Sequence, residues 1–193
     1  MFALLTVDEL VSRDLEIERL LLRIANDDGK REAFGRLYEL ISTDVYAYAL
    51  SKTGDEADAE DITEECFVKI YKFAPQYKPK GKPMAWIFTI AINLFKRQRV
   101  IKSRYIALDD EMGENLKDDS ISPEGIAVNN DLVNILLNTL SESERDVVIM
   151  HAVSGLKHRE IARLLDEPIS TVLSRYNRAI KKLKEKCEKG GVL

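Results

Sequence analysis

The sequence has no Asp or Glu between Cys66 and Leu108, although the whole chain of 193 residues carries a net charge of −4. The basic residues of this stretch are Lys69, Lys72, Lys78, Lys80, Lys82, Lys96, Arg97, Arg99, Lys102 and Arg104. Because phosphate groups attract a surface of one positive sign, the stretch favours a nucleic-acid partner. A solvated basic helix end would carry the same charges, so the choice between these two interpretations depends on the surrounding sequence.

Other features that the sequence lacks exclude several protein classes. Its two cysteines, Cys66 and Cys187, are far apart and match no metal-ligand spacing. His151 and His158 lie outside any His-Glu-x-x-His pattern, and we assign them a core or surface role. There is no nucleophile–base pairing and no phosphate-binding glycine loop, so we expect neither an enzyme nor a cofactor or small-molecule substrate. No run of eighteen apolar residues and no signal-peptide pattern occurs, so we expect a cytoplasmic protein.

The sign of the charge alternates along the chain. Residues 1–68 carry −10, residues 69–105 carry +10, residues 106–131 carry −7 and residues 132–193 carry +3. A single enzyme domain has no need of this alternation. The pattern indicates two basic units separated by an acidic spacer.

Apolar residues recur with helical spacing, and no stretch alternates with a period of two, which predicts an all-α protein. In the first half of the chain, helices are expected after the capping box at 6–9 until a break at 26–29, from 30 to 41, and from a cap at Thr43 or Asp44 to a turn at 53–55. Two more are expected over 58–71 and 83–103. In the second half, helices are expected from 122 to 140, after the capping box at 141–144, over 157–165 and over 169–186. Residues 107–120 are polar, acidic and aperiodic, as is typical of a linker with little fixed structure.

One face of the helix expected over 83–103 combines an aromatic ring, short polar side chains and cations. At about 100° per residue, these side chains fall within one arc: Trp86, Thr89, Asn93, Lys96 and Arg97. The residues that point away and would fill a core are Ile87, Ala91, Leu94 and Phe95. Cations pair with phosphates and unstacked bases stack on aromatic rings, so the arc suits a single nucleic-acid strand.

Two neighbouring segments have both structural and functional interpretations. The helix over 58–71 carries acids in its first half and bases in its second, which complements the helix dipole or provides an acidic docking face. The loop over 74–82 contains prolines, lysines and Tyr77, and is either a solvated loop or a rim beside Trp86. Farther along, a short helix, a tight turn and a longer helix with polar and basic exposure form a helix-turn-helix pattern over 157–186.

Three blocks in this order resemble the extracytoplasmic-function (group IV) sigma factors of bacterial RNA polymerase. They cover residues 58–67, 85–93 and 140–178, and the third includes Gly155-Leu156, Glu160-Ile161-Ala162, Thr171-Val172 and Ser174-Arg175. The resemblance implies two small helical domains joined by a flexible acidic linker. It places sigma region 2 in residues 1–105, the linker in 106–121 and sigma region 4 in 122–193.

The resemblance also implies a role for each unit. The factor would bind the largest and second-largest subunits of core polymerase and promoter DNA, and it would be inhibited by a membrane-linked anti-sigma factor. Docking on the clamp helices of the largest subunit would involve Asp58, Asp61, Ile62, Glu64 and Glu65. Recognition and melting of the −10 element would involve Tyr77, Lys78, Lys80, Trp86, Thr89, Asn93, Lys96 and Arg97. The −35 duplex would be read by Ser170, Thr171, Ser174, Arg175, Arg178 and Lys182, with Arg175 as the first candidate. The linker would pass through the polymerase towards the RNA exit path.

The helix-turn-helix departs from the family pattern at several positions. Lys157 stands where a helix-capping Ser or Thr is usual, Asp166-Glu167-Pro168 forms the turn, and Leu173 replaces a frequent Lys. An acidic turn beside DNA weakens non-specific attraction, so we expect the free protein to bind duplex DNA poorly.

Two other classes of protein are alternatives. A stand-alone regulator of the LuxR type shares the Leu-Ser-x-x-Glu opening of the C-terminal segment, but it would need an α/β domain before it. An RNA-modifying enzyme could use the basic stretch, but the sequence offers it no catalytic set.

Overall fold

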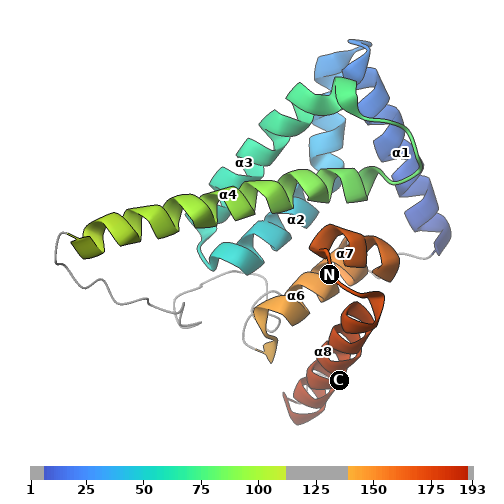
Figure 1. Cartoon of the computed structure of the whole chain (residues 1–193). Helices are drawn as coiled ribbons and strands as arrows, with labels where there is room; N and C mark the ends of the chain where they lie inside the picture. The colour runs from blue at the N-terminus through green and yellow to red at the C-terminus, as the bar shows by residue number, and fades with distance from the viewer. Residues whose placement is uncertain (1–6, 112–138, 191–193) are drawn as a thin grey trace.

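The computed structural model describes residues 7–111 and 139–190, and every regular element in these two ranges is a helix. The predicted all-helical class is therefore confirmed. The N-terminal body consists of α1 (Val7–Ala25), α2 (Lys30–Thr53), α3 (Glu56–Phe73), the 3-10 turn η1 (Ala74–Gln76) and α4 (Pro83–Glu111). The C-terminal body consists of α6 (Glu142–Val148), the π-helical turn η3 (Ile149–Val153), α7 (His158–Leu165) and α8 (Ile169–Gly190). In Figure 1, α4 crosses α2 and α3, and the C-terminal body lies along one side of α4.

The ends of the helices follow from local sequence. Gly54 ends α2 with φ 69°, a left-handed conformation that glycine adopts without a steric penalty. Asp55 then caps α3, because its side chain accepts the N–H of Asp58 at 2.9 Å. The predicted turn at 53–55 is therefore confirmed.

The predicted break near Thr43 is wrong, because α2 is continuous from Lys30 to Thr53. Asp44 is not a cap: its side chain is buried and accepts a hydrogen bond from Arg13 of α1, with 2.8 Å between Nη2 and Oδ2. No glycine or proline follows Gly35 within the helix, so nothing in the backbone interrupts it.

The structure extends α4 to Glu111, beyond the predicted end at 103 and into the segment assigned to the linker. The cause is again local, since no glycine or proline occurs between Pro83 and Glu111. The rest of the linker and the helix expected over 122–140 lie almost entirely outside the described residues.

The N-terminal body is held by apolar faces that meet where the helices cross. Ile17, Leu37 and Ile70, from α1, α2 and α3, are fully buried together with Phe88 of α4. Ile87, Ala91 and Leu94 are also buried, as the helical periodicity predicted. Burial of this inner side of α4 leaves Asn93, Lys96 and Arg97 exposed.

The C-terminal body begins with the predicted capping box. The N–H and the hydroxyl of Ser141 both donate to the Glu144 carboxylate at 3.0 Å, and α6 starts at the next residue. The helix continues into η3 and stops at Ser154, as expected. A left-handed Asp166, with φ 56°, then turns the chain from α7 into α8, so α7 and α8 form the predicted helix-turn-helix.

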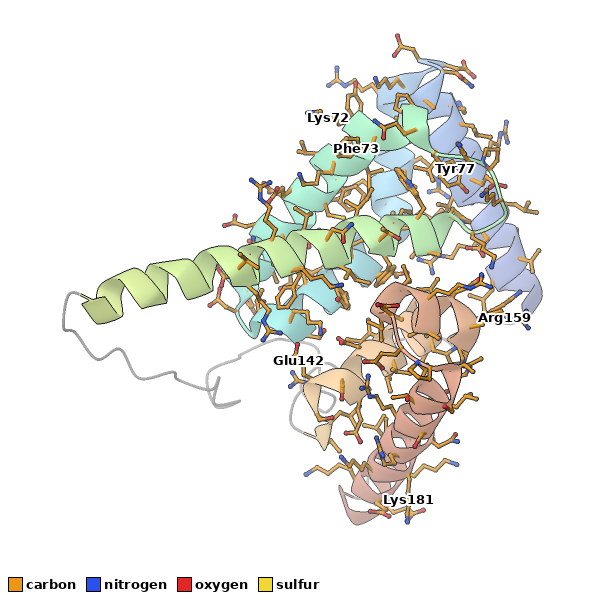
Figure 2. All side chains as sticks on the ribbon, viewed as in Figure 1. Lys72, Phe73, Tyr77, Glu142, Arg159 and Lys181 are labelled. Carbon is orange, nitrogen blue, oxygen red and sulfur yellow. The ribbon has the colours of Figure 1, made fainter. Side chains whose placement is uncertain are left out.

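The two bodies pack against each other through ion pairs and a shared apolar cluster. Lys52, at the end of α2, contacts Asp146 of α6 at 2.6 Å and Glu142 at 2.9 Å. The side chains of Lys52 and Asp146 are only 7% and 9% exposed. A second pair joins Lys82, just before α4, to Glu160 of α7 at 2.9 Å. Figure 2 shows Glu142 beside the end of α2. One buried apolar cluster extends through both bodies, and a smaller one lies between α2 and α3 and contains Ala49, Leu50, Ala59 and Ile62.

Candidate nucleic-acid interface

A hollow of about 360 Å³ lies between the end of α3 and the outer side of α4. It is lined by Lys69, Phe73, Gln76, Trp86, Ile90, Asn93, Leu94 and Arg97. Three of the predicted −10 residues, Trp86, Asn93 and Arg97, therefore lie at one site. Its walls combine apolar and aromatic surface with two amides and two cations. The sequence analysis had not assigned Lys69, Phe73 or Gln76 to it, because the approach of α3 to α4 is set by tertiary packing.

The remaining predicted −10 residues divide into exposed side chains and one buried ring. Lys78, Lys80 and Lys96 are exposed, and the Thr89 hydroxyl donates to the carbonyl of Ala85 at 2.8 Å. Tyr77 is only 7% exposed, so its predicted role in touching DNA is not compatible with this structure.

Tyr77 instead packs against Trp86 on the protein-interior side of the hollow. Its ring packs edge-on against Trp86, with ring centroids 5.2 Å apart, and its hydroxyl donates to Glu18 of α1 at 2.7 Å. The backbone N–H of Gly81 donates to the same carboxylate oxygen at 3.0 Å. Burial, together with the hydrogen bond to Glu18, raises the pKa of Tyr77. Glu18 thereby fixes both ends of the lysine-rich loop, a role that no local pattern in the sequence indicates.

The outer face of α3 carries the predicted docking residues with one exception. Asp58, Asp61 and Glu64 are exposed, and Glu65 is partly exposed beside Lys69, 3.4 Å away. Ile62 is 1% exposed and belongs to the core, so it is removed from the proposed contact set.

A second hollow, of about 420 Å³, adjoins this acidic face between α2 and α3. It is lined by Tyr38, Ser42, Thr43, Tyr46, Glu60, Thr63 and Glu64. Farther along α3, Val68 and Tyr71 are 65% and 41% exposed. The acids of α3 thus border exposed apolar and aromatic surface, a composition that favours a protein partner.

On α8, ion pairs within the protein engage several of the predicted −35 residues. Arg175 contacts Glu167 of the turn at 2.5 Å, and its side chain is only 20% exposed. Lys182 contacts Glu144 at 2.7 Å, with Arg178 3.8 Å from the same carboxylate. Ser170 and Ser174 are exposed, whereas Thr171 is partly buried. Arg175 is therefore less available to DNA than the sequence suggested.

His151 of η3 and His158 of α7 form a pair of tilted rings beside α8. Their ring centroids are 4.0 Å apart, and the edge of each ring meets Tyr176 of α8 at 4.9 Å. His151 Nδ1 lies 2.8 Å from the carbonyl of Leu156. Burial and the neighbouring imidazole lower the pKa of His158. Both side chains are partly buried against Tyr176, so the pair contributes to the packing of α7 and α8.

No helix in the described ranges combines the length and the apolar character needed to cross a membrane. Residues 7–111 contain helices and no strand, so the α/β domain that a LuxR-type regulator would require is not found there.

Comparison with protein families matches two segments of the chain. Residues 37–104 match sigma-70 region 2, and residues 135–183 match sigma-70 region 4. The first segment contains α3 and the hollow beside Trp86, and the second contains the helix-turn-helix. Together they define a sigma-70-type transcription initiation factor.

Similar proteins identify the group of sigma factors to which the chain belongs. The chain is 29% identical over 181 residues to the ECF RNA polymerase sigma-E factor of Escherichia coli K12, spanning 88% of this chain and 93% of that protein. It is 31% identical over 162 residues to the ECF RNA polymerase sigma factor BldN of Streptomyces coelicolor, spanning 80% of this chain and 60% of BldN. A solved structure of the sigma factor RpoE with the anti-sigma factor NepR from Bartonella quintana matches with a TM-score of 0.59 and 25% identity, covering 80% of this chain and 96% of RpoE. The chain belongs to the extracytoplasmic-function sigma factors, which recognise promoters for RNA polymerase.

Proposed function

We propose that this sigma factor divides its work among three surfaces. The outer face of α3 docks on core polymerase, the hollow beside Trp86 holds a base of the melted −10 element, and α8 reads the −35 duplex. Residues 1–105 act as region 2 and residues 122–193 as region 4. The connection between them, residues 106–121, begins within α4 and passes through the polymerase towards the RNA exit path.

The observation that carries this proposal is the composition of the hollow beside Trp86. A flipped base needs an apolar or aromatic surface to replace its lost stacking, and a polar group to meet its edge. Trp86 and Phe73 provide the first, and Asn93 provides the second. Lys69 and Arg97 add positive charge at the walls, where the backbone phosphates of a single strand would pass.

Replacing Trp86 with Ala should impair promoter opening far more than polymerase binding. Stacking on an aromatic ring contributes about 1–3 kcal/mol per base, so opening should fall by roughly 5- to 150-fold. Trp86→Phe, which keeps a stacking surface, should recover most of the activity. Permanganate reactivity of unpaired thymines measures opening, and native gel electrophoresis with core polymerase measures binding. An equal loss of binding and opening in Trp86→Ala would refute the proposed role.

Reversing the charge at Asp61 and Glu64 together should have the opposite effect. Both side chains are exposed on α3, so Lys at these positions should leave the fold intact and weaken the complex with core polymerase. The matched control reverses two exposed acids in and after the α1–α2 turn, Asp28 and Glu32, at the same cost in net charge. If both double variants bound core polymerase equally well, α3 would not be the docking face.

The factor acts in the cytoplasm with the polymerase, and an anti-sigma factor inhibits it. Support for such an inhibitor comes from the matched RpoE structure, which contains the anti-sigma factor NepR. Affinity purification of the tagged chain from its own cells should recover an inhibitory protein that competes with core polymerase. Recovery of core polymerase alone, under inducing and non-inducing conditions, would remove this part of the proposal. The factor itself contributes no catalytic group, so RNA synthesis remains the work of the polymerase.

A further inference from the structure

The exposed face of α8 overlaps the predicted −35 set but is wider than it, because Ser170, Ser174 and Arg178 are exposed while Arg175 is partly buried. Val172 and Ala179 are 0% exposed and mark the side that packs on α6 and α7. The exposed residues of α8 include Ser170, Leu173, Ser174, Asn177, Arg178, Lys181 and Lys182. Three of them, Leu173, Asn177 and Lys181, were absent from the predicted −35 set.

The first two turns of this face are neutral. The sequence from Ile169 to Ser174 contains neither Lys nor Arg. Arg175, the next cation, contacts Glu167, and Lys182 contacts Glu144. The N-terminal residues of a recognition helix are the ones that reach base edges in the major groove. Phosphate attraction therefore contributes little at the point where bases would be read, and sequence selection depends on neutral side chains.

Apolar side chains lie at this point instead. Ile169 is 49% exposed and Leu173 is 40% exposed, one helical turn apart. Thymine is the only base that presents a methyl group in the major groove, and an apolar side chain recognises it by contact. One turn after Leu173, the exposed Asn177 amide can donate to N7 and accept from N6 of adenine in the bidentate arrangement that Asn makes.

We infer that this face selects A·T base pairs in the upstream promoter element: Leu173, flanked by Ile169, contacts thymine methyl groups, and Asn177 pairs with adenine. The inference rests on the proposed function of α8. Leu173 and Asn177 are four residues apart, or about 6 Å along the helix axis. Base pairs are spaced about 3.4 Å apart, so the two contacts fall within about two base-pair steps. Leu173 and Asn177 are thus specificity-determining residues.

Run-off transcription tests the inference with the full chain, core polymerase and a promoter library randomised over the upstream element. The wild-type protein should select A·T pairs at neighbouring positions. Asn177→Ala should lose the preference for adenine at one position, by about 5- to 150-fold. Leu173→Ala should lose the preference for thymine at a nearby position.

Replacing the selected thymine with deoxyuridine removes only the methyl group. This change should lower wild-type transcription by about fourfold, the value of one buried carbon, and should leave Leu173→Ala unaffected. Both positions are exposed, so the variants should unfold at the wild-type temperature. Lys181→Ala is the matched control: Lys181 projects from the exposed side of α8 (Figure 2), and its loss should weaken all promoters equally and lower the salt slope by about one.

Two results would overturn the inference while leaving the proposed function in place. One is a selected promoter with G·C pairs at the positions that Leu173→Ala and Asn177→Ala affect. The other is a uniform loss across the library, as expected for Lys181→Ala. If wild-type protein and core polymerase selected no promoter sequence, the proposed function itself would fail, and the inference with it.

Discussion

At the scale of single residues, Glu144 connects the start of α6 to the recognition helix. Its carboxylate accepts two hydrogen bonds from Ser141 and one from Lys182. Although burial opposes ionisation, the hydrogen bonds from Lys182 and Ser141 lower the pKa of Glu144. Glu144 thus contributes to the capping box of α6 and also engages Lys182 of α8 in an ion pair, so that Lys182 is less available to DNA.

Glu144→Gln should strengthen non-specific binding to duplex DNA. Gln retains the capping box, but it no longer holds Lys182 and Arg178 by charge. One additional phosphate contact would steepen the dependence of log affinity on log salt by about 0.9. Fluorescence anisotropy with random-sequence duplexes measures this slope. The salt concentration should be varied over roughly 50 to 300 mM. Glu188→Gln, which neutralises an exposed acid of α8, should leave the slope unchanged. An unaltered slope in Glu144→Gln would mean that Lys182 does not reach phosphate.

Asp14 determines part of the pH dependence of stability. Burial, together with Glu160 of α7, raises its pKa from 3.8 to about 6. An acid with a raised pKa stabilises the folded state at low pH, and this contribution is lost as the pH rises through about 6. Asp14→Asn should therefore be more stable than wild type at pH 7.5, by about 1–2 kcal/mol once solvent screening is allowed for, and this difference should shrink as the pH falls from about 6 towards 3.8.

Urea unfolding at a series of pH values measures this difference. Asp44, whose burial raises its pKa to about 6 against the effect of Arg13, titrates in the same range. Asp44 is present in each protein, so its contribution cancels in the comparison. Asp28→Asn, which alters an exposed acid, serves as the control. A stability gap of constant size from pH 4.5 to 7.5 would exclude titration of Asp14 as its cause.

At the scale of helices and turns, the same substitution should have opposite effects at two glycines. Gly155 has φ +72°, and a Cβ there would lie 2.6 Å from Leu10 Cδ2. Gly35 lies within α2, and a Cβ there would meet nothing within 4 Å. Gly155→Ala should lower the free energy of unfolding by about 1–2 kcal/mol because the left-handed conformation penalises a side chain. Gly35→Ala should raise it by about 0.5–1 kcal/mol through helix propensity. Thermal unfolding measures both, and shifts of the same sign would contradict the described backbone.

The elements that could be predicted are those whose signals are local. The Ser141–Glu144 capping box, the turn at Gly54 and the helix-turn-helix all lie where the sequence indicated them. Asp44 was mistaken for a cap because its partner, Arg13, is 31 residues away. A capping residue and a buried ion-pair partner are indistinguishable until the helices are packed.

The candidate site shows the same limit. The periodicity of α4 brought Trp86, Asn93 and Arg97 to one face, and the structure adds residues of α3 that the sequence could not assign. Tyr77 was expected at the surface because its loop is rich in lysine and proline. Its burial depends on Glu18, 59 residues earlier, so only the tertiary structure reveals it. On α8, the periodicity identified Ser170, Ser174 and Arg178 as exposed, but the partial burial of Arg175 beside Glu167 became visible only in the packed structure.

At the scale of the whole molecule, the buried pair of Lys52 and Asp146 joins the two bodies. Removing one partner of a buried ion pair costs about 3–5 kcal/mol, because the other charge stays in an apolar environment. Lys52→Met should therefore destabilise the protein by this amount and loosen the packing of the C-terminal body. Urea unfolding and the radius of gyration from small-angle X-ray scattering measure the two effects.

Replacing both partners should restore much of the loss. Lys52→Met combined with Asp146→Leu removes both buried charges and leaves only Glu142, the second partner of Lys52, which is 49% exposed; such exchanges are often neutral or stabilising. Lys181→Met is the control, since Lys181 and its partner Glu185 are 80% and 52% exposed and their pair should contribute at most about 1 kcal/mol. Wild-type stability and dimensions in Lys52→Met would show that the two bodies do not depend on this pair.

The contact at Lys52 also bears on how the protein can be dissected. A boundary placed between the two bodies would expose the end of α2 on one fragment and Asp146, amid the apolar residues Val147 and Val148, on the other. Each fragment would then expose apolar surface to water and would tend to self-associate. Aggregation of a truncated protein would therefore be a consequence of the truncation. Truncations designed with neutral residues at positions 52 and 146 should remain monodisperse at higher concentrations.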